Sequence, residues 1–173
     1  MKPDAGYRLA WLALALSCVG CKPQAPASDE ARPAFDTIQL QVMTASDTFA
    51  LTVELAETDE QHAFGLMDRT QLASDGGMLF VYPSIQDSTS QFWMHRTRIP
   101  LDIAFWDAAG RILTIQSMEP CQLVNSDLCP RYRAGVIHAG ALELNKGWFA
   151  RHNVRVGDHV RVLPTPEQAR STQ

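Results

Sequence analysis

The sequence predicts an α+β domain, mainly antiparallel β, in which short strands form a small closed or nearly closed barrel with two short helices. Two observations lead to this prediction. Segments in which apolar and polar residues alternate recur along the chain, as in half-buried strands, and turn residues separate them. Only two brief segments have the pattern of a helix, and no internal repeat is present.

The first predicted elements are a hairpin and a helix. Apolar residues alternate with polar ones over 37–43 and 49–55, and Ala45 to Asp47 form the turn between these strands. Thr58 and Gln61 then match a capping box, which predicts a helix from Asp59 to about Asp68. Its buried side would carry Ala63, Phe64 and Met67.

The middle of the chain holds the most informative stretch. Residues 78–82 form a continuous apolar run that predicts a strand buried on both faces, ended by Pro83 and followed by a polar loop over 84–90. Residues 91–117 then predict a strand, a polar bend closed by Pro100, a strand over 101–106, a turn and a third strand. In the strand over 101–106, Asp102 should project from the face opposite three large apolar residues.

The last third of the chain predicts shorter elements. Short strands are expected over 136–138 and 141–144, with Leu142 and Leu144 inward and Glu143 on the opposite side. Asn145 would cap a helix over 146–152. A terminal strand over 154–162 would be broken by a turn at Gly157 and Asp158.

Length and composition favour one globular domain with appendages. The 173 residues are 46% hydrophobic and 20% charged, and a net charge of −4 gives no basic stripe for nucleic acid. We expect a signal peptide over 1–20, a lipidated cysteine and disordered tether over 21–35, a folded domain over 36–163 and a tail over 164–173.

The N-terminus is similar to a bacterial lipoprotein signal. Lys2 and Arg8 precede an apolar run over 9–19 that is too short to span a bilayer, and Gly20 stands before Cys21. Cys21 is therefore the expected lipidation site. Cys18 as the modified residue and an ordinary cleaved signal are the alternatives. Lys22, rather than Asp, after Cys21 favours the outer membrane over the inner, with the domain on the periplasmic side of the cell envelope.

Export determines how the remaining cysteines are interpreted. Cys121 and Cys129 flank a polar loop, and in an oxidising compartment they are a disulfide candidate. The only CxxC spacing, between Cys18 and Cys21, lies in the targeting segment, so catalytic thiol chemistry is not expected.

Several blocks of the sequence resemble the DUF192 (UPF0127) family of unknown function. The blocks are GLMDR (65–69), GMLFVY (77–82), FWMHRTRIPLDIAFWDAAG (92–110), ALELNKG (141–147) and GDHVRV (157–162). The resemblance covers about residues 47–162 and implies a small β-rich α+β fold without an established activity. Two departures stand out. His95-Arg96-Thr97 replaces the family's common Lys-Asn-Thr, and the cysteine loop is longer than usual.

Polar residues within these blocks are the candidate site. Arg69 could bind a carboxylate or phosphate, Trp93 could give a stacking surface, and Asp102 and Glu143 could form a catalytic carboxylate pair, with Thr97 nearby. The alternative is architectural, with Arg69 paired to Asp102 or Glu143.

Metal sites and cofactors are not expected. The histidines have no ligand-pair spacing, so a zinc site from His95, His138 and Asp102 is a minor alternative, and the methionines lack the clustering of a copper site.

The sequence thus predicts an exported, lipid-anchored domain that binds a small polar or anionic ligand at the barrel mouth. Its partners would be the membrane, through the N-terminal lipid, and that ligand. The alternatives are an envelope hydrolase that uses the carboxylate pair, and a protein-interaction module.

Overall fold

A seven-stranded sheet in the order β6-β5-β8-β3-β2-β1-β9 organises the domain in the computed structural model, which describes residues 32–164. A second sheet pairs β4 with β7. The strands are β1 (Asp36–Met43), β2 (Thr48–Ala56), β3 (Gly77–Gln86), β4 (Gln91–Trp93), β5 (Leu101–Trp106), β6 (Ile112–Met118), β7 (Arg131–Arg133), β8 (His138–Asn145) and β9 (His159–Val162), and the helices are α1 (Asp59–Phe64) and α2 (Trp148–Arg151), with a 3₁₀ turn, η1 (Ser126–Leu128).

The large sheet is curled but open. Val160 of β9 and Ile112 of β6, from the two ends of the strand order, pack in one apolar cluster, so the sheet must curl around it. A single isolated bridge, Arg111 to His159, joins those ends. The predicted mostly β fold with two short helices is therefore confirmed, whereas the closed form of the barrel is wrong.

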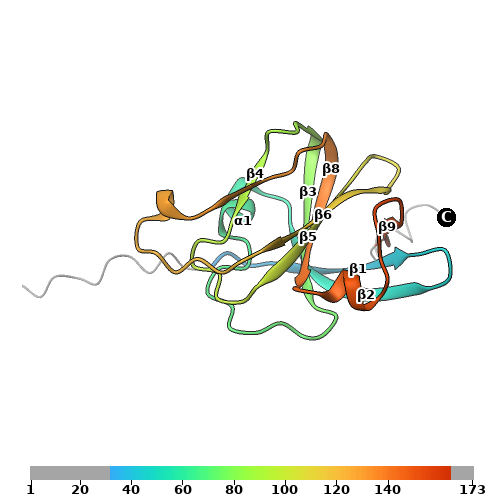
Figure 1. Cartoon of the computed structure of the whole chain (residues 1–173), viewed down its shortest axis with the longest axis horizontal. Helices are drawn as coiled ribbons and strands as arrows, with labels where there is room; N and C mark the ends of the chain where they lie inside the picture. Colours follow the sequence, from blue (N-terminus) through green and yellow to red (C-terminus); the bar gives the residue numbers. More distant parts are fainter. Residues whose placement is uncertain (1–31, 165–173) are drawn as a thin grey trace, which may run out of the picture. The chain divides into compact units, whose positions relative to one another are not determined.

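A second apolar cluster lies on the outer face of the same central strands. It contains Met78 and Phe80 of β3 and Ile103 and Phe105 of β5, together with Met118. Figure 1 shows α1 and β4 on one side of the central strands β3, β8, β5 and β6, with β1, β2 and β9 on the other. The central strands are thus covered on both faces, and all six residues of β5 are buried rather than half-buried as expected.

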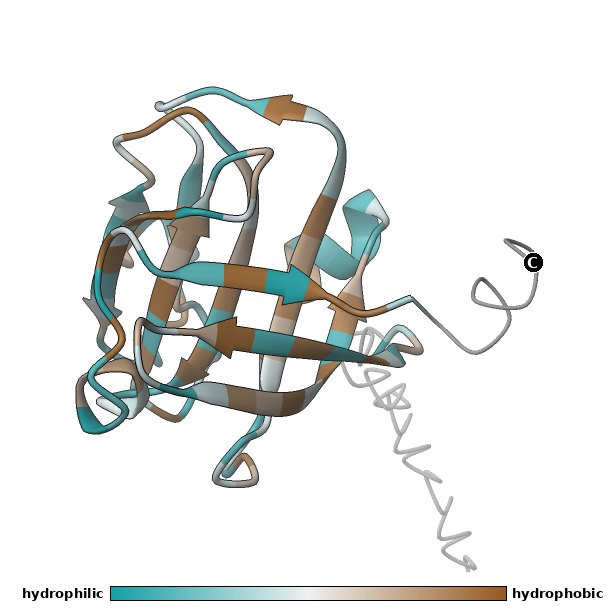
Figure 2. Ribbon diagram, turned by 90° about the vertical axis from the view of Figure 1, so that its right-hand side faces the viewer, coloured by the Kyte–Doolittle hydropathy of each residue, from teal (hydrophilic) through white to brown (hydrophobic). Residues whose placement is uncertain are grey.

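Local sequence signals explain most of the element ends. The hairpin of β1 and β2 is confirmed, with the alternation of apolar and polar residues visible along these strands in Figure 2. Thr58 accepts a hydrogen bond from the Gln61 backbone, and the Gln61 side chain accepts from the Thr58 N–H, which confirms the capping box. The helix ends sooner than predicted because Gly65 adopts φ +50°, a left-handed conformation that stops a helix.

Other boundaries differ from the prediction for physical reasons. β3 continues past Pro83 to Gln86, because its pairing with β8 is irregular between Val81 and Gln86 and a proline is tolerated there. The two strands expected over 136–144 are the single strand β8. α2 begins after Gly147, while Asn145 instead donates to the Ala73 carbonyl.

Part of the expected tether contacts the domain. Arg32 pairs with Glu54, and the Ala34 carbonyl accepts a hydrogen bond from Gln61. The expected signal peptide, the lipidation site Cys21 and the tail beyond residue 164 lie outside the described residues. Between Arg32 and Pro164 the chain forms no helix with the length and apolar character needed to cross a membrane.

Candidate functional site

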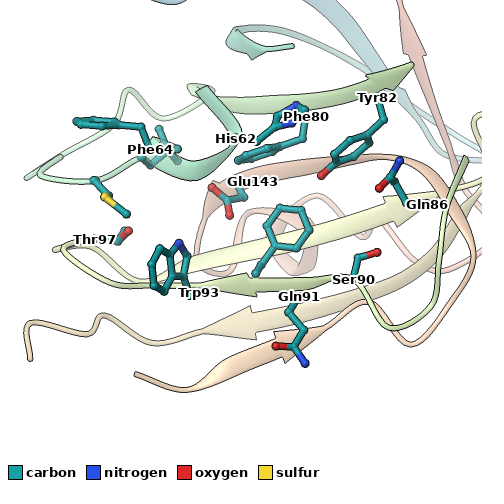
Figure 3. A pocket seen from close by; sticks show the side chains of 14 residues that line it. His62, Phe64, Phe80, Tyr82, Gln86, Ser90, Gln91, Trp93, Thr97 and Glu143 are labelled. Atoms are coloured by element: carbon teal, nitrogen blue, oxygen red, sulfur yellow. The ribbon is translucent and has the colours of Figure 1, made fainter. Parts of the chain in front are cut away.

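A cavity of about 250 Å³ lies between α1, β3, β4 and β8, over the outer face of the sheet (Figure 3). Its lining is mainly aromatic and apolar, with a few polar groups. The lining residues are His62, Phe64, Gly65, Leu66, Met67, Phe80, Tyr82, Gln86, Ser90, Gln91, Phe92, Trp93, Thr97 and Glu143. A concave apolar site with a few polar groups is the usual form of a small-molecule site.

Aromatic rings support the walls of the cavity. The rings of Phe80 and Phe92 meet edge to face with centroids 5.2 Å apart. The ring centroids of His62 and Tyr82 are 4.7 Å apart. Trp93 carries the Arg131 guanidinium over its ring, 4.2 Å from the centroid. These contacts hold the rings in fixed orientations around the space.

Glu143 is the only acidic residue among the lining residues. Glu143 lies in the middle of β8, directly opposite Ile103 of β5, and is 4% exposed. Its carboxyl group points into the space between the labelled aromatic side chains in Figure 3. Among residues 32–164 no hydrogen bond or ion pair reaches it at ordinary distances, and burial raises the pKa of this carboxyl group to about 8.

The other titratable residues of the lining are His62 and Tyr82. The Nε2 atom of His62 lies 3.1 Å from the Ala56 carbonyl oxygen and 3.0 Å from that of Val81, so Nε2 carries the proton that it donates. Burial, and secondarily the nearby Glu143, raise the pKa of Tyr82, which keeps its hydroxyl protonated.

The structure brings together three of the five residues that the sequence singled out. Trp93, Thr97 and Glu143 all line the cavity. Arg69 does not line it and instead pairs with Glu54 of β2. The alternative that Arg69 forms an architectural ion pair holds, but the predicted partners, Asp102 and Glu143, are wrong, because the partner is Glu54.

Asp102 faces the opposite side of the sheet from Glu143. It pairs in register with Leu144, one residue along β8, so the two carboxyl side chains point to different faces. Asp102 accepts hydrogen bonds from the Ser117 hydroxyl at 2.6 Å and the Gly147 N–H at 2.7 Å. The expected carboxylate pair is not formed, and the hydrolase mechanism that required it loses its geometry.

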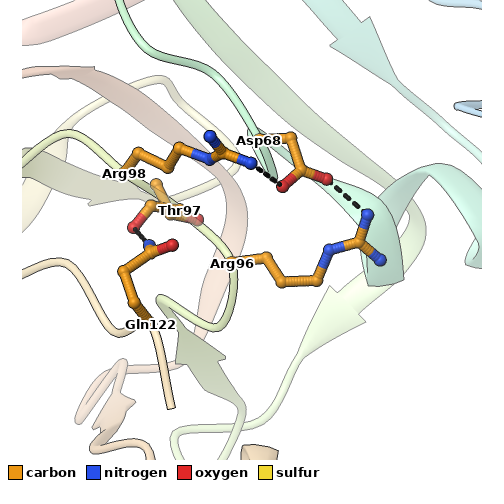
Figure 4. A network of polar contacts seen from close by, with 5 residues as sticks. All are labelled: Asp68, Arg96, Thr97, Arg98 and Gln122. Carbon is orange, nitrogen blue, oxygen red and sulfur yellow. Dashed lines mark hydrogen bonds and ion pairs between the residues drawn. The ribbon is translucent and has the colours of Figure 1, made fainter. Parts of the chain in front are cut away.

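The polar bend before β5 forms one wall of the site. Asp68 and Arg96 both adopt positive φ, +60° and +57°, and the Asp68 N–H donates to the Arg96 carbonyl. The Asp68 carboxylate pairs with Arg96 and Arg98, which lowers its pKa, chiefly through the Arg96 hydrogen bond (Figure 4). Gln122 donates to the Thr97 carbonyl at 2.7 Å, so the bend is held on two sides.

The departure from the family's common Lys-Asn-Thr falls at the left-handed position of this bend. Asparagine tolerates positive φ better than most residues. Arg96 takes that conformation here and gains its ion pair with Asp68.

A disulfide-bonded segment also contacts this bend. Cys121 and Cys129 are joined, with Cα atoms 5.8 Å apart, which confirms the predicted pair. The Cys121 N–H donates to the Met94 carbonyl, and the Arg96 N–H donates to the Cys121 carbonyl. The disulfide therefore anchors the segment that carries Trp93 and Thr97 to the cavity.

Several lining residues were missed by sequence reasoning. Phe80 and Tyr82 alternate along β3 on the face that Glu143 shares, but this pattern becomes informative only once the pairing of β3 with β8 is known. His62, on α1, has no motif around it. In the part of the chain that the structure describes, no group of three or more His, Cys, Asp or Glu side chains is arranged to hold a metal, so His95, His138 and Asp102 do not gather.

Comparison with known proteins agrees with the blocks found in the sequence. The model of the DUF192 family, described as an uncharacterized ACR, matches residues 41–162. A protein of Sinorhizobium meliloti 1021 described as a putative transcription regulator has a similar crystal structure, with 34% identity, a TM-score of 0.66, and coverage of 75% of this chain and 96% of that one. A protein of unknown function from Novosphingobium aromaticivorans DSM 12444 has 31% identity and a TM-score of 0.63, covering 72% and 84% of the two chains. No curated protein matches the chain in sequence.

Proposed function

Since this chain belongs to the DUF192 family, whose activity is not established, we propose from the site itself that the domain binds a small polar ligand in the cavity beside Glu143. The observation that carries this proposal is the buried carboxyl group of Glu143, which faces an open space and has no hydrogen-bond partner among residues 32–164. Burying a polar group without a partner costs free energy. A ligand that hydrogen-bonds or pairs with Glu143 would recover this cost.

The charge of the lining narrows the class of ligand. Neither Lys nor Arg is among the described residues that line the cavity, and Arg69, the expected anion-binding group, is paired with Glu54 outside it. An anion would therefore meet a carboxyl group and no compensating cation. Of the polar and anionic ligands that the sequence left open, the polar class is the better supported.

The cavity proposal can be tested by thermal shift over a small-molecule library. A ligand present at about 100 times its Kd stabilises the folded state by about 2.7 kcal/mol, which raises Tm by about 5–10 °C in a chain of this size. Glu143→Gln should lose most of the shift, since it changes the central polar group and little else. Arg69→Ala, outside the cavity, should retain it. If no compound stabilises the parent protein, the proposal fails.

We further propose that the domain is exported and anchored by a lipid on Cys21, in the outer membrane rather than the inner membrane. The apolar run before Cys21 and a disulfide, which persists in oxidising compartments, support this location. Cys21→Ser should abolish incorporation of a labelled fatty acid and release the protein from the membrane fraction, while Cys18→Ser should not. If Cys18→Ser loses the label instead, Cys18 is the lipidated residue. If the parent protein takes up no label, the N-terminal segment is an ordinary cleaved signal peptide.

A further inference from the structure

On the basis of that proposed function, we infer that the ligand is a small organic cation, an ammonium group that sits between the Glu143 carboxylate and the aromatic walls of the cavity. The inference concerns the chemical class of the ligand and depends on three features of the site: its charge, its rings and its size.

The charge of the site favours a cation. The titratable groups that face Glu143 are His62 from α1 and Tyr82 from β3, while His138 lies farther along β8 and β5 presents only Ile103 opposite it. Tyr82 stays protonated, and burial lowers the pKa of His138, which keeps that ring neutral. Among the described residues that line the cavity, the ionised carboxylate has neither a Lys nor an Arg partner. A ligand that brings a positive charge would be attracted to this carboxylate more strongly than in bulk water, because the residue is buried among apolar side chains.

The rings of the lining fit the same ligand. Five aromatic side chains contribute: Phe64, Phe80, Tyr82, Phe92 and Trp93. Cations are attracted to the faces of such rings, most strongly to tryptophan, and quaternary ammonium ligands are recognised in this way. Trp93 already holds one cation, the Arg131 guanidinium, over its ring. A second cation from the cavity side would use the other lining rings as well.

The size of the cavity limits the ligand to a few heavy atoms. At about 250 Å³ the space lies just below the range of about 300–1,000 Å³ typical of drug-sized ligands. Tetramethylammonium, choline and a short alkylammonium fit this limit.

Binding of a cation would be coupled to loss of a proton. At neutral pH the empty site holds Glu143 as the carboxylic acid, because burial raises its pKa to about 8. A bound cation favours the carboxylate, so one proton leaves Glu143 for the solvent as one cation enters. As pH is raised toward about 8, the affinity for the cation should therefore increase about tenfold per pH unit. Above about pH 8 the affinity should be constant.

The experiment is calorimetric titration of the full chain with matched probes. Choline is compared with 3,3-dimethylbutan-1-ol, its uncharged isostere, and butylammonium is compared with butan-1-ol and butyrate. We expect the cations to bind at least about tenfold more tightly than the uncharged and anionic probes. Repeating the choline titration in buffers of different ionisation enthalpy at pH 7 should give close to one proton released per cation.

Two variants make the result specific. Glu143→Gln should lose at least about tenfold in choline affinity and should release no proton. Glu60→Gln makes the same chemical change at an exposed position on α1 and should leave both quantities unchanged. Thr97→Val, also in the lining, should keep the proton release even if its affinity falls, which separates loss of charge from loss of shape.

The outcomes distinguish this inference from the proposed function. If butyrate or the uncharged probes bind as well as the cations, the cavity is a ligand site but not a cation site. If cations bind without proton release, or equally to Glu143→Gln, Glu143 is not the charge partner. If no probe and no library compound binds, both proposals fall.

Discussion

Two buried carboxyl groups on neighbouring strands, Asp102 of β5 and Glu143 of β8, have nearly equal exposure and opposite surroundings. Asp102 is 5% exposed and Glu143 4%. Asp102 accepts hydrogen bonds from Ser117 and Gly147, on β6 and at the start of α2. Glu143 faces the cavity and has burial as the dominant influence on its pKa.

Burial alone therefore does not identify a functional carboxylate. The two partners of Asp102 belong to two other segments of the fold, β6 and the start of α2, so its carboxylate links β5 to both. Glu143 ties nothing together in the described chain, and its position costs stability instead of adding it. A costly group that contributes no bond to the fold is the better candidate for ligand binding.

Removing the Asp102 side chain should have the largest effect on stability. Asp102→Ala leaves the Gly147 N–H without its acceptor and removes two charge-assisted hydrogen bonds, so we expect a loss of about 3–5 kcal/mol. Urea denaturation at pH 7 measures the loss. Asp102→Asn keeps one carbonyl oxygen as an acceptor and should lose roughly half as much. A cost below about 1 kcal/mol for Asp102→Ala would remove the contrast with Glu143.

Changing Glu143 should instead make the protein less sensitive to pH. The folded pKa of about 8 lies above the ordinary value of 4.5, so the folded state holds one more proton than the unfolded state between these values. The free energy of unfolding must therefore fall as pH rises through this window, by up to about 1.4 kcal/mol per pH unit.

Glu143→Gln lacks this titration. Its stability relative to the parent should be near equal at pH 5 and should exceed it by about 3 kcal/mol at pH 8. Urea denaturation at several pH values gives the difference directly, and all other titrating groups cancel in it. A difference that does not change with pH would mean that Glu143 titrates as an ordinary surface carboxylate.

The sequence predicted the face of each carboxyl group better than its environment. Alternation within 101–106 placed Asp102 opposite Leu101, Ile103 and Phe105, and alternation around Glu143 placed it opposite Leu142 and Leu144, and both placements hold. The period of a strand fixes these facts locally. What it does not fix is register between strands, which sets Asp102 beside Leu144 and Glu143 beside Ile103.

The cavity depended on long-range contacts that no local pattern encodes. His62 comes from α1, Tyr82 from β3 and Trp93 from β4, and they meet only because β3 and β8 pair beneath them. Thr97 and Trp93 were found because they lie in the blocks shared with the family. Arg69 lies in such a block too, but its partner Glu54 belongs to β2, which precedes the first of these blocks.

Loss of the disulfide should weaken the cavity side of the sheet more than the Asp102 side. The Cys121–Cys129 link closes a short loop, and its removal in a double Cys→Ala variant should cost about 2–3 kcal/mol. Because Cys121 exchanges backbone hydrogen bonds with Met94 and Arg96, amide exchange should quicken over 94–97 and stay slow in β5. Reductant should reproduce the effect in the parent and add nothing to the variant. Exchange over 94–97 that stays slow in the variant would mean that the bend is held by Gln122 and the Asp68 ion pairs alone. Equal loosening of both sides would mean that the disulfide does not act mainly on the cavity side.

The smallest effect should come from Ser117→Ala, which removes one of the two donors to Asp102. Ser117 lies directly across from Asp102 on β6 and is exposed, so water can replace its hydroxyl and the loss should be only about 1 kcal/mol. A double-mutant cycle with Asp102→Ala isolates the pair, since the second change should cost almost nothing once Asp102 is absent. In Glu143→Gln the same substitution should cost its full value, because the two carboxyl groups lie on opposite faces and share no partner. Coupling between Ser117 and Glu143 would instead show that the two faces respond as one unit, and the separation of an architectural side from a ligand-binding side would have to be given up.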